Sequence, residues 1–119
     1  MARFEFWQDL DMDNLPKVEV LNGVIFTADS GANQLGVRVT KGGQSVTLSG
    51  TVRGFVIKPD GTMVNDISGT RSGNTASIVL PAAAYTVPGM ARVIIKLLVS
   101  GAETTTLGAW DIFVASSAT

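Results

Sequence analysis

Turn signals recur at short, regular intervals along this chain, and their spacing constrains its fold more than any other feature. They lie at Leu21-Asn22-Gly23, Asp29-Ser30-Gly31, Lys41-Gly42-Gly43-Gln44, Ser49-Gly50, Pro59-Asp60-Gly61, Ser72-Gly73-Asn74, Pro88-Gly89 and Ser100-Gly101. The runs between them are rich in Val, Ile, Thr and Phe and lack the apolar period of a helix. This pattern predicts an all-β fold, and we expect an antiparallel β-sandwich of the immunoglobulin-like or jelly-roll-like kind.

Alternation within the runs supports strands that have one buried face. In the segment 35–40, Leu35, Val37 and Val39 share one side of an extended chain and Arg38 lies on the other. One short helical turn is expected near residues 81–85, because proline suits the first helical position and three alanines follow it there.

The chain of 119 residues has the size of one domain, and no linker divides it. Its start is distinct, because Phe4, Phe6 and Trp7 cluster there next to half of the acidic residues. Aromatic side chains so close to a terminus need a surface to cover them. We therefore expect an N-terminal docking arm at residues 1–16 and a single β-sandwich domain at 17–119. The arm either folds back on its own domain or reaches to a neighbour.

Two segments, 91–99 and 104–115, are apolar on both faces, which is typical of strands covered twice. In the first of them, Ile94 and Leu98 stand opposite the expected core face. Either a terminal segment or a neighbouring subunit covers this second face. Charged residues make up 16% of the chain, below the usual share of about 25%, which indicates buried contact with other copies or other proteins. The predicted interface residues are Phe4, Phe6, Trp7, Ile94 and Leu98.

The residues that most enzymes use are missing. The sequence has no His and no Cys, which removes Ser-His-Asp arrangements, thiol nucleophiles and the commonest general base. No phosphate-binding GK[ST] loop is present. Asp111, which lies in an apolar segment, is expected to pair with Arg53 or Arg92 as a structural ion pair. We expect no enzyme activity, no catalytic residues and no cofactor.

A calcium loop is suggested by Asp9, Asp11 and Asp13 but is not expected. The EF-hand template that begins D-x-D-x-D requires Gly at its sixth position and Glu at its twelfth, where this chain has Asn14 and Val20. A solvated acidic arm is the better interpretation, and no metal site is predicted.

Charge and hydropathy also limit the partners. The net charge is −1 and the nine Lys and Arg residues are scattered, so no basic stripe predicts nucleic-acid binding. The longest apolar run, at 93–99, contains Lys96, and no membrane span is expected. The segment 56–64, VIKPDGTMV, has the turn chemistry of a hairpin tip. If this tip binds anything, we expect its contact to be a neighbouring subunit.

Three motifs in the second half of the chain resemble a known family. They are LSGTVRGFVIKPDG, SGNTASIVLPAAAYTVPG and VIIKLLVSGAETTTLGA, in this order and spacing. Together they resemble the N-terminal domain of the phage baseplate upper protein family, and related domains occur in phage head-fibre proteins. The resemblance covers 46–114, whereas 1–40 match only in general pattern. Longer family members continue into a linker and a fibre domain, and this sequence ends before any stalk.

The resemblance implies a β-rich bacteriophage virion structural protein, without catalytic residues, that self-associates and docks onto the particle at a baseplate, collar or fibre attachment. By analogy we expect a homo-oligomer, a trimer, that binds other virion proteins after assembly in the host bacterial cytoplasm. One alternative is a head fibre or capsid decoration protein on the capsid surface. A further alternative is a carbohydrate- or protein-binding β-sandwich.

Overall fold

The computed structural model describes residues 4–27, 33–99 and 104–116. This part of the chain forms one short 3-10 helix, η1 (Ala82–Tyr85), at the place where one helical turn was predicted. No helix in the described residues is long and apolar enough to cross a membrane. The strands are β1 (Phe4–Asp11), β2 (Val18–Phe26), β3 (Asn33–Lys41), β4 (Gln44–Ser45), β5 (Thr51–Ile57), β6 (Met63–Ser72), β7 (Thr75–Val79), β8 (Gly89–Leu98) and β9 (Thr104–Ala115).

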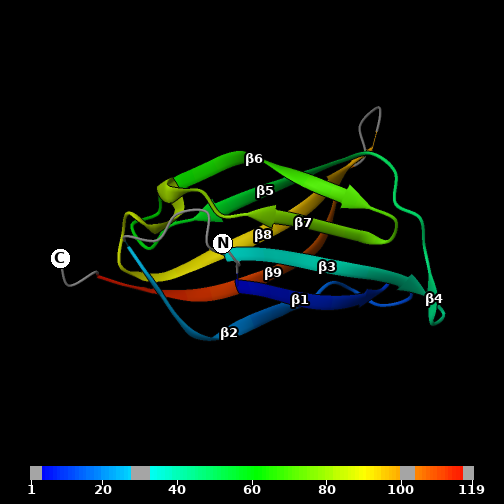
Figure 1. Cartoon of the computed structure of the whole chain (residues 1–119), viewed down its shortest axis with the longest axis horizontal. Coiled ribbons are helices and arrows are strands. Elements are labelled where there is room, and N and C mark those ends of the chain that lie inside the picture. The colour runs from blue at the N-terminus through cyan, green and yellow to red at the C-terminus, as the bar shows by residue number, and fades with distance from the viewer. Residues whose placement is uncertain (1–3, 28–32, 100–103, 117–119) are drawn as a thin grey trace.

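All of these strands belong to one curled, open sheet (Figure 1). Neighbouring strands follow the order β1-β3-β7-β6-β5-β8-β9-β2, and β4 pairs with β3. The prediction of an all-β fold is confirmed. The antiparallel sandwich is not confirmed, because the sheet is continuous and both edge pairs, β1 with β3 and β2 with β9, are parallel. The physical reason is that β1, β2 and β3 do not form consecutive hairpins, so β1 and β2 each run alongside a strand of the same direction.

Strand β6 connects the two layers of the curled sheet. Its first half pairs with β5, and its second half pairs with β7. Within its pairing with β5, between Val64 and Ile67, the register shifts, and Asp66 has a φ angle of 54°. A bulge of this kind bends a strand and increases its twist. Figure 1 shows β6 along one side of the molecule, with β1 and β2 along the opposite side.

The core lies between the layers and is closed at one end by η1. Alternate residues of the strands fill it, and the largest fully buried side chains include Trp110, Tyr85, Leu35, Ile78 and Leu80. The hydroxyl of Tyr85 accepts a hydrogen bond of 3.2 Å from the side-chain amide of the buried Asn33. The polar end of the tyrosine is therefore satisfied inside the core.

The sheet remains open between its two edges, where the N-terminal segment lies. Residues 4–11, which the sequence assigned to the docking arm, form β1 and pair with β3 along their whole length. Gln8 is buried, and its side-chain amide donates a hydrogen bond to the carbonyl of Ala109 in β9. This contact ties β1 to the opposite layer across the open side.

The bulge in β6 gives the first testable prediction. Replacement of Asp66 by Val should lower the free energy of unfolding by about 1–2 kcal/mol, because a β-branched residue strongly disfavours positive φ. Replacement of the nearby exposed Ser68 by Val, where φ is not positive, serves as the matched control. Urea denaturation measures both values. Equal effects of the two substitutions would contradict the assignment of strain to Asp66.

Candidate interaction surface

The curled sheet has two outer faces, and they differ in chemistry. The outward positions of β1, β3 and β7 carry mainly polar residues, among them Glu5, Asp9, Gln34, Arg38 and Thr75. This polar face has the composition that a sheet in contact with water requires. The outer face of the other layer can be compared with this polar face.

The outer face of the second layer carries exposed apolar side chains on five adjacent strands. We call this set the apolar patch; it consists of Val20, Val24, Ile57, Met63, Met90 and Phe113. Val20 is 71% exposed, Met90 52% and Phe113 46%. Single exposed apolar residues are ordinary on a protein surface, but a contiguous group of large ones marks an interaction site.

Strand register makes the apolar patch contiguous. Val24 of β2 is the partner of Phe113 in β9, and Phe113 is the partner of Met90 in β8. On the far side of β8, Ile57 of β5 is the partner of Met63 in β6. Side chains on directly opposed residues of neighbouring strands lie within about 5.5 Å of one another at Cβ. The patch is therefore one surface rather than a set of isolated residues.

An ion pair lies in the middle of the patch. Arg92 of β8 opposes both Ile57 and Asp111 in register, and Asp111 opposes Val20. The Arg92 Nε donates to Asp111 Oδ1 at 2.7 Å and Nη2 donates to Oδ2 at 3.0 Å, so the contact is bidentate. These hydrogen bonds lower the pKa of Asp111 below its ordinary 3.8 and raise the pKa of Arg92. Of the two partners expected for Asp111, the structure has Arg92.

A groove of about 420 Å³ lies beside this ion pair, next to the predicted hairpin tip. In the tip, the Lys58 N–H donates to the carbonyl of Thr62, and the Asp60 carboxylate accepts from the N–H and hydroxyl of Thr62. The hydroxyl contact lowers the pKa of Asp60. The segment is thus a hydrogen-bonded turn, as predicted, and it forms one wall of the groove. The residues lining the groove are Ile57, Lys58, Pro59, Gly61, Met90, Ala91, Arg92 and Asp111.

The predicted interface residues fall into two separate places. Ile94 and Leu98 lie on β8, half-buried, on the same outer face as the patch. Phe4, Phe6 and Trp7 lie on β1 in the other layer. Phe4 and Phe6 line a second, mostly apolar cavity of about 480 Å³ between β1 and β2. The structure does not bring the two groups together, and a role of either group in an interface stays a prediction.

Trp7 makes its contacts within its own sheet. Its ring lies over Gly36, its register partner on β3, and the guanidinium of Arg38 lies 4.9 Å from the ring centroid. The indole N–H donates to the carboxylate of Glu5 at 3.2 Å. An aromatic ring that covers a glycine on a neighbouring strand is a recurrent stabilising pair in sheets.

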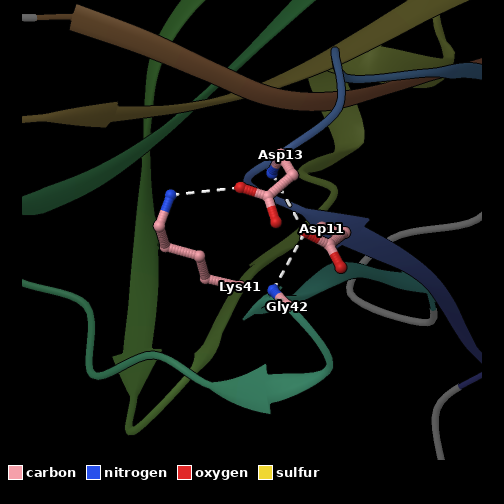
Figure 2. Close-up of polar contacts among 4 residues, drawn as sticks. All are labelled: Asp11, Asp13, Lys41 and Gly42. Atoms are coloured by element: carbon pink, nitrogen blue, oxygen red, sulfur yellow. Dashed lines mark hydrogen bonds and ion pairs between the residues drawn. The ribbon is translucent and has the colours of Figure 1, made fainter.

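The acidic residues of the expected arm fasten one turn to another (Figure 2). The Asp11 carboxylate accepts the N–H of Asp13 at 3.0 Å and that of Gly42 at 3.3 Å, while Lys41 pairs with Asp13 at 3.2 Å. The N–H of Asp13 is the main cause of the lowered pKa of Asp11. Among the described residues, no group of three or more acidic side chains converges on a metal-sized site.

Sequence reasoning missed Met90, Phe113, Val24 and Met63 as surface residues. Alternation showed that the segment 104–115 has two apolar faces, but it did not show which face the core takes. The deciding information is the pairing of β9 with β8 on one side and with β2 on the other. Of these two strands, β2 lies far from β9 in the sequence. The four methionines were a usable signal, because two of them, Met63 and Met90, are on the patch.

Comparison with known proteins adds one finding. No family model matches the chain, and no curated protein matches it. Among solved structures, it is similar to the N-terminal domain of phage TP901-1 ORF48, with a TM-score of 0.56 and 11% identity. The match covers 96% of this chain and 98% of that domain. The chain has the fold of a phage protein domain. At this identity the similarity establishes the fold alone.

The position of Trp7 can be tested through Gly36. A methyl group at residue 36 would lie within 2.8 Å of three ring atoms of Trp7. Gly36→Ala should therefore displace the ring and lower the free energy of unfolding by about 1–3 kcal/mol. The chain has two Trp residues, so NMR can separate their indole signals. The signal of Trp7 should shift and that of the buried Trp110 should not; an unmoved Trp7 signal would contradict the stacking.

The ion pair predicts a dependence of stability on pH. The folded-state pKa of Asp111 is below 3.8, so its ionised form stabilises the fold above that pH, and the contribution is lost as the pH falls through the folded value. Wild type should therefore be more stable than Asp111→Asn at neutral pH, and this difference should shrink by about pH 2. Urea denaturation at both values measures it, and a difference that grows in acid would contradict the pairing.

Proposed function

We propose that this chain is a structural module of a bacteriophage virion that docks onto a larger component of the particle. The observation that carries the proposal is the similarity of fold to the phage TP901-1 ORF48 domain, over nearly the whole of both chains. The three motifs of the second half, which resemble the baseplate upper protein family, support the same assignment. The proposed position is a baseplate, collar or fibre attachment, and the capsid surface is the alternative.

The apolar patch is the docking surface in this proposal. Burial of one large apolar side chain is worth about 1.5–3 kcal/mol, and the patch presents six apolar side chains. Phe113 and Met90 lie side by side in it and belong to the residue types that are enriched in protein interfaces. The polar face of the same sheet presents no comparable set of exposed apolar residues among the described ones. One face therefore contacts the particle and the other contacts water.

No catalytic step belongs to the proposed role. A structural module needs surface complementarity, and the lack of His and Cys in the sequence is consistent with that requirement. In this proposal the protein is part of the virion after assembly and is no longer a free protein of the host cytoplasm.

The proposal is tested on virions from the strain whose genome encodes the chain. Antibodies against the purified protein, used for immunogold electron microscopy, should label the particle at one location. Labelling at the tail end supports the baseplate, collar or fibre position, whereas labelling over the head supports the capsid alternative. Virions that carry none of the protein would overturn the proposed function.

Paired variants test the docking surface. Phe113→Asp places a charge in the apolar patch and should lower incorporation into virions about ten-fold or more, equivalent to the loss of one side chain's burial. Leu15→Asp is the matched control, because Leu15 is 86% exposed and lies outside the patch. Quantitative immunoblotting of purified virions gives the comparison. Equal incorporation of both variants would exclude this face as the docking surface.

A further inference from the structure

Two cations lie opposite each other on the outer face that carries the apolar patch. Arg53 of β5 and Lys96 of β8 are register partners, and both residues are half-buried. We call these two residues the cation pair. Like charges on directly opposed residues of neighbouring strands destabilise a sheet. The cation pair therefore works against the stability of the free protein.

The cation pair has no acidic partner among the described residues. None of the ion pairs in this part of the chain includes Arg53 or Lys96. Their register partners on the outer strands are the uncharged Ser68 of β6 and Thr106 of β9. Asp66, the acidic residue of β6, makes no ion pair with either cation. The two positive charges are therefore not balanced by any described residue of the chain.

The contacts that the two cations do make leave their charge in place. Arg53 Nη1 donates to the carbonyl of Val52 at 3.1 Å, which uses one of the five N–H donors of a guanidinium. The Lys96 ammonium lies 5.0 Å from the centroid of the Phe55 ring. A carbonyl and an aromatic face attract a cation but carry no net negative charge. Both side chains therefore keep donors for an anion of a partner.

The cation pair continues the docking surface of the proposed function. The next outward row along β5 and β8 is formed by Phe55 and Ile94, which are apolar and half-buried. Beyond it lies the row of Ile57, a patch residue, and Arg92, which is neutralised by Asp111. Four residues of a strand span about 13 Å, which is well within the width of an interface that buries about 800 Å² of each partner. A partner that covers the patch therefore also reaches the cation pair.

We propose that the particle component bound by this face presents a carboxylate to the cation pair, from an Asp or Glu side chain flanked by apolar residues. The inference rests on the proposed function, in which this face is the docking surface, and it specifies the chemistry of the partner. A carboxylate placed between Arg53 and Lys96 accepts charge-assisted hydrogen bonds from both and balances their mutual repulsion. Apolar residues around this contact exclude water, which strengthens the attraction between opposite charges.

Nucleic acid fits this face less well than protein does. A nucleic-acid surface neutralises many phosphates with a broad basic patch. The cation pair is instead bordered by apolar residues, and the whole chain has a net charge of −1. Phe113 and Met90 are exposed on the same face, and they require an apolar partner surface. A protein that combines a carboxylate with apolar side chains meets both requirements.

Competition for places in the virion tests the role of the two charges. A host that expresses an epitope-tagged copy of the chain is infected with the phage, so tagged and untagged copies compete during assembly. Arg53→Gln and Lys96→Gln should each lower the ratio of tagged to untagged protein in purified virions about ten-fold or more, as loss of one partner of a buried charge pair does. Arg53→Lys and Lys96→Arg keep the charge and should recover most of the incorporation.

The matched control removes a cation from the other layer. Lys41 has an exposed side chain and pairs with Asp13, so Lys41→Gln changes the net charge equally without touching the docking surface. Its ratio in virions should equal that of tagged wild type, and quantitative immunoblotting measures all the ratios. Circular dichroism of each purified variant establishes that it is folded before the ratios are compared.

Cross-linking identifies the group that faces Lys96. A carbodiimide joins a lysine amine directly to a carboxylate that it touches, and mass spectrometry of treated virions locates the joined residues. We expect Lys96 to be joined to an Asp or Glu of a different virion protein. Lys96 joined to an acidic residue of this chain, or joined to none, would overturn the inference.

The results also separate this inference from the proposed function. If tagged wild type enters virions and the glutamine variants enter equally well, the docking function stands and the carboxylate partner falls. If the glutamine variants are lost but Lys96 is joined to no carboxylate, the cations bind another anion, such as a nucleic-acid phosphate, and again only the inference falls. Virions that hold neither tagged nor untagged protein contradict the proposed function, and the inference falls with it.

Discussion

The whole architecture depends on one strand that pairs with two layers. Strand β6 is bound to β5 over its first half and to β7 over its second, and the bulge at Asp66 lies shortly before the change of partner. A single sheet can therefore curl over its own core without a second, separate sheet. Because the sheet is continuous, each outward side chain lies on one of two outer faces. One of these faces is polar, and the other carries the apolar patch.

That difference links the fold to the proposed role. On the polar face, Trp7 is held by Gly36 and Arg38 within its own layer, so an aromatic ring in a conspicuous position in the sequence is already engaged. On the other face, Phe113 and Met90 have no such cover. In the proposed role this face is covered by a partner, because assembly subunits bury apolar surface that a monomer has to make polar.

Local chemistry was enough to predict the turns at 41–44, 59–61 and 72–74, the single helical turn and the all-β class, because Gly, Pro and Asp act on their immediate neighbours. The turn predicted at 21–23 is wrong, since these residues lie inside β2 at its register shift, and the turns predicted at 29–31 and 100–101 lie outside the described residues. Local chemistry also reduced the partner of Asp111 to two arginines. Local chemistry could not predict the parallel edge pairs. The pairing of β2 with β9, for example, joins residues about ninety positions apart, and no local sequence pattern indicates it. The same long-range pairing decides that Phe113 faces outward, so the apolar patch could not be read from alternation alone. The fold-level neighbour does not identify a partner either, because at 11% identity surfaces are free to diverge.

The buried amide of Gln8 has a consequence for how the protein is made. It donates to the carbonyl of Ala109, a residue 101 positions later, so β1 cannot make this contact until β9 has been synthesised. Contacts between such distant segments slow folding, because loop closure precedes any gain. Until then the side-chain amide of Gln8 lacks this partner. The period before β9 closes the fold is therefore when strands of different copies are most exposed to each other.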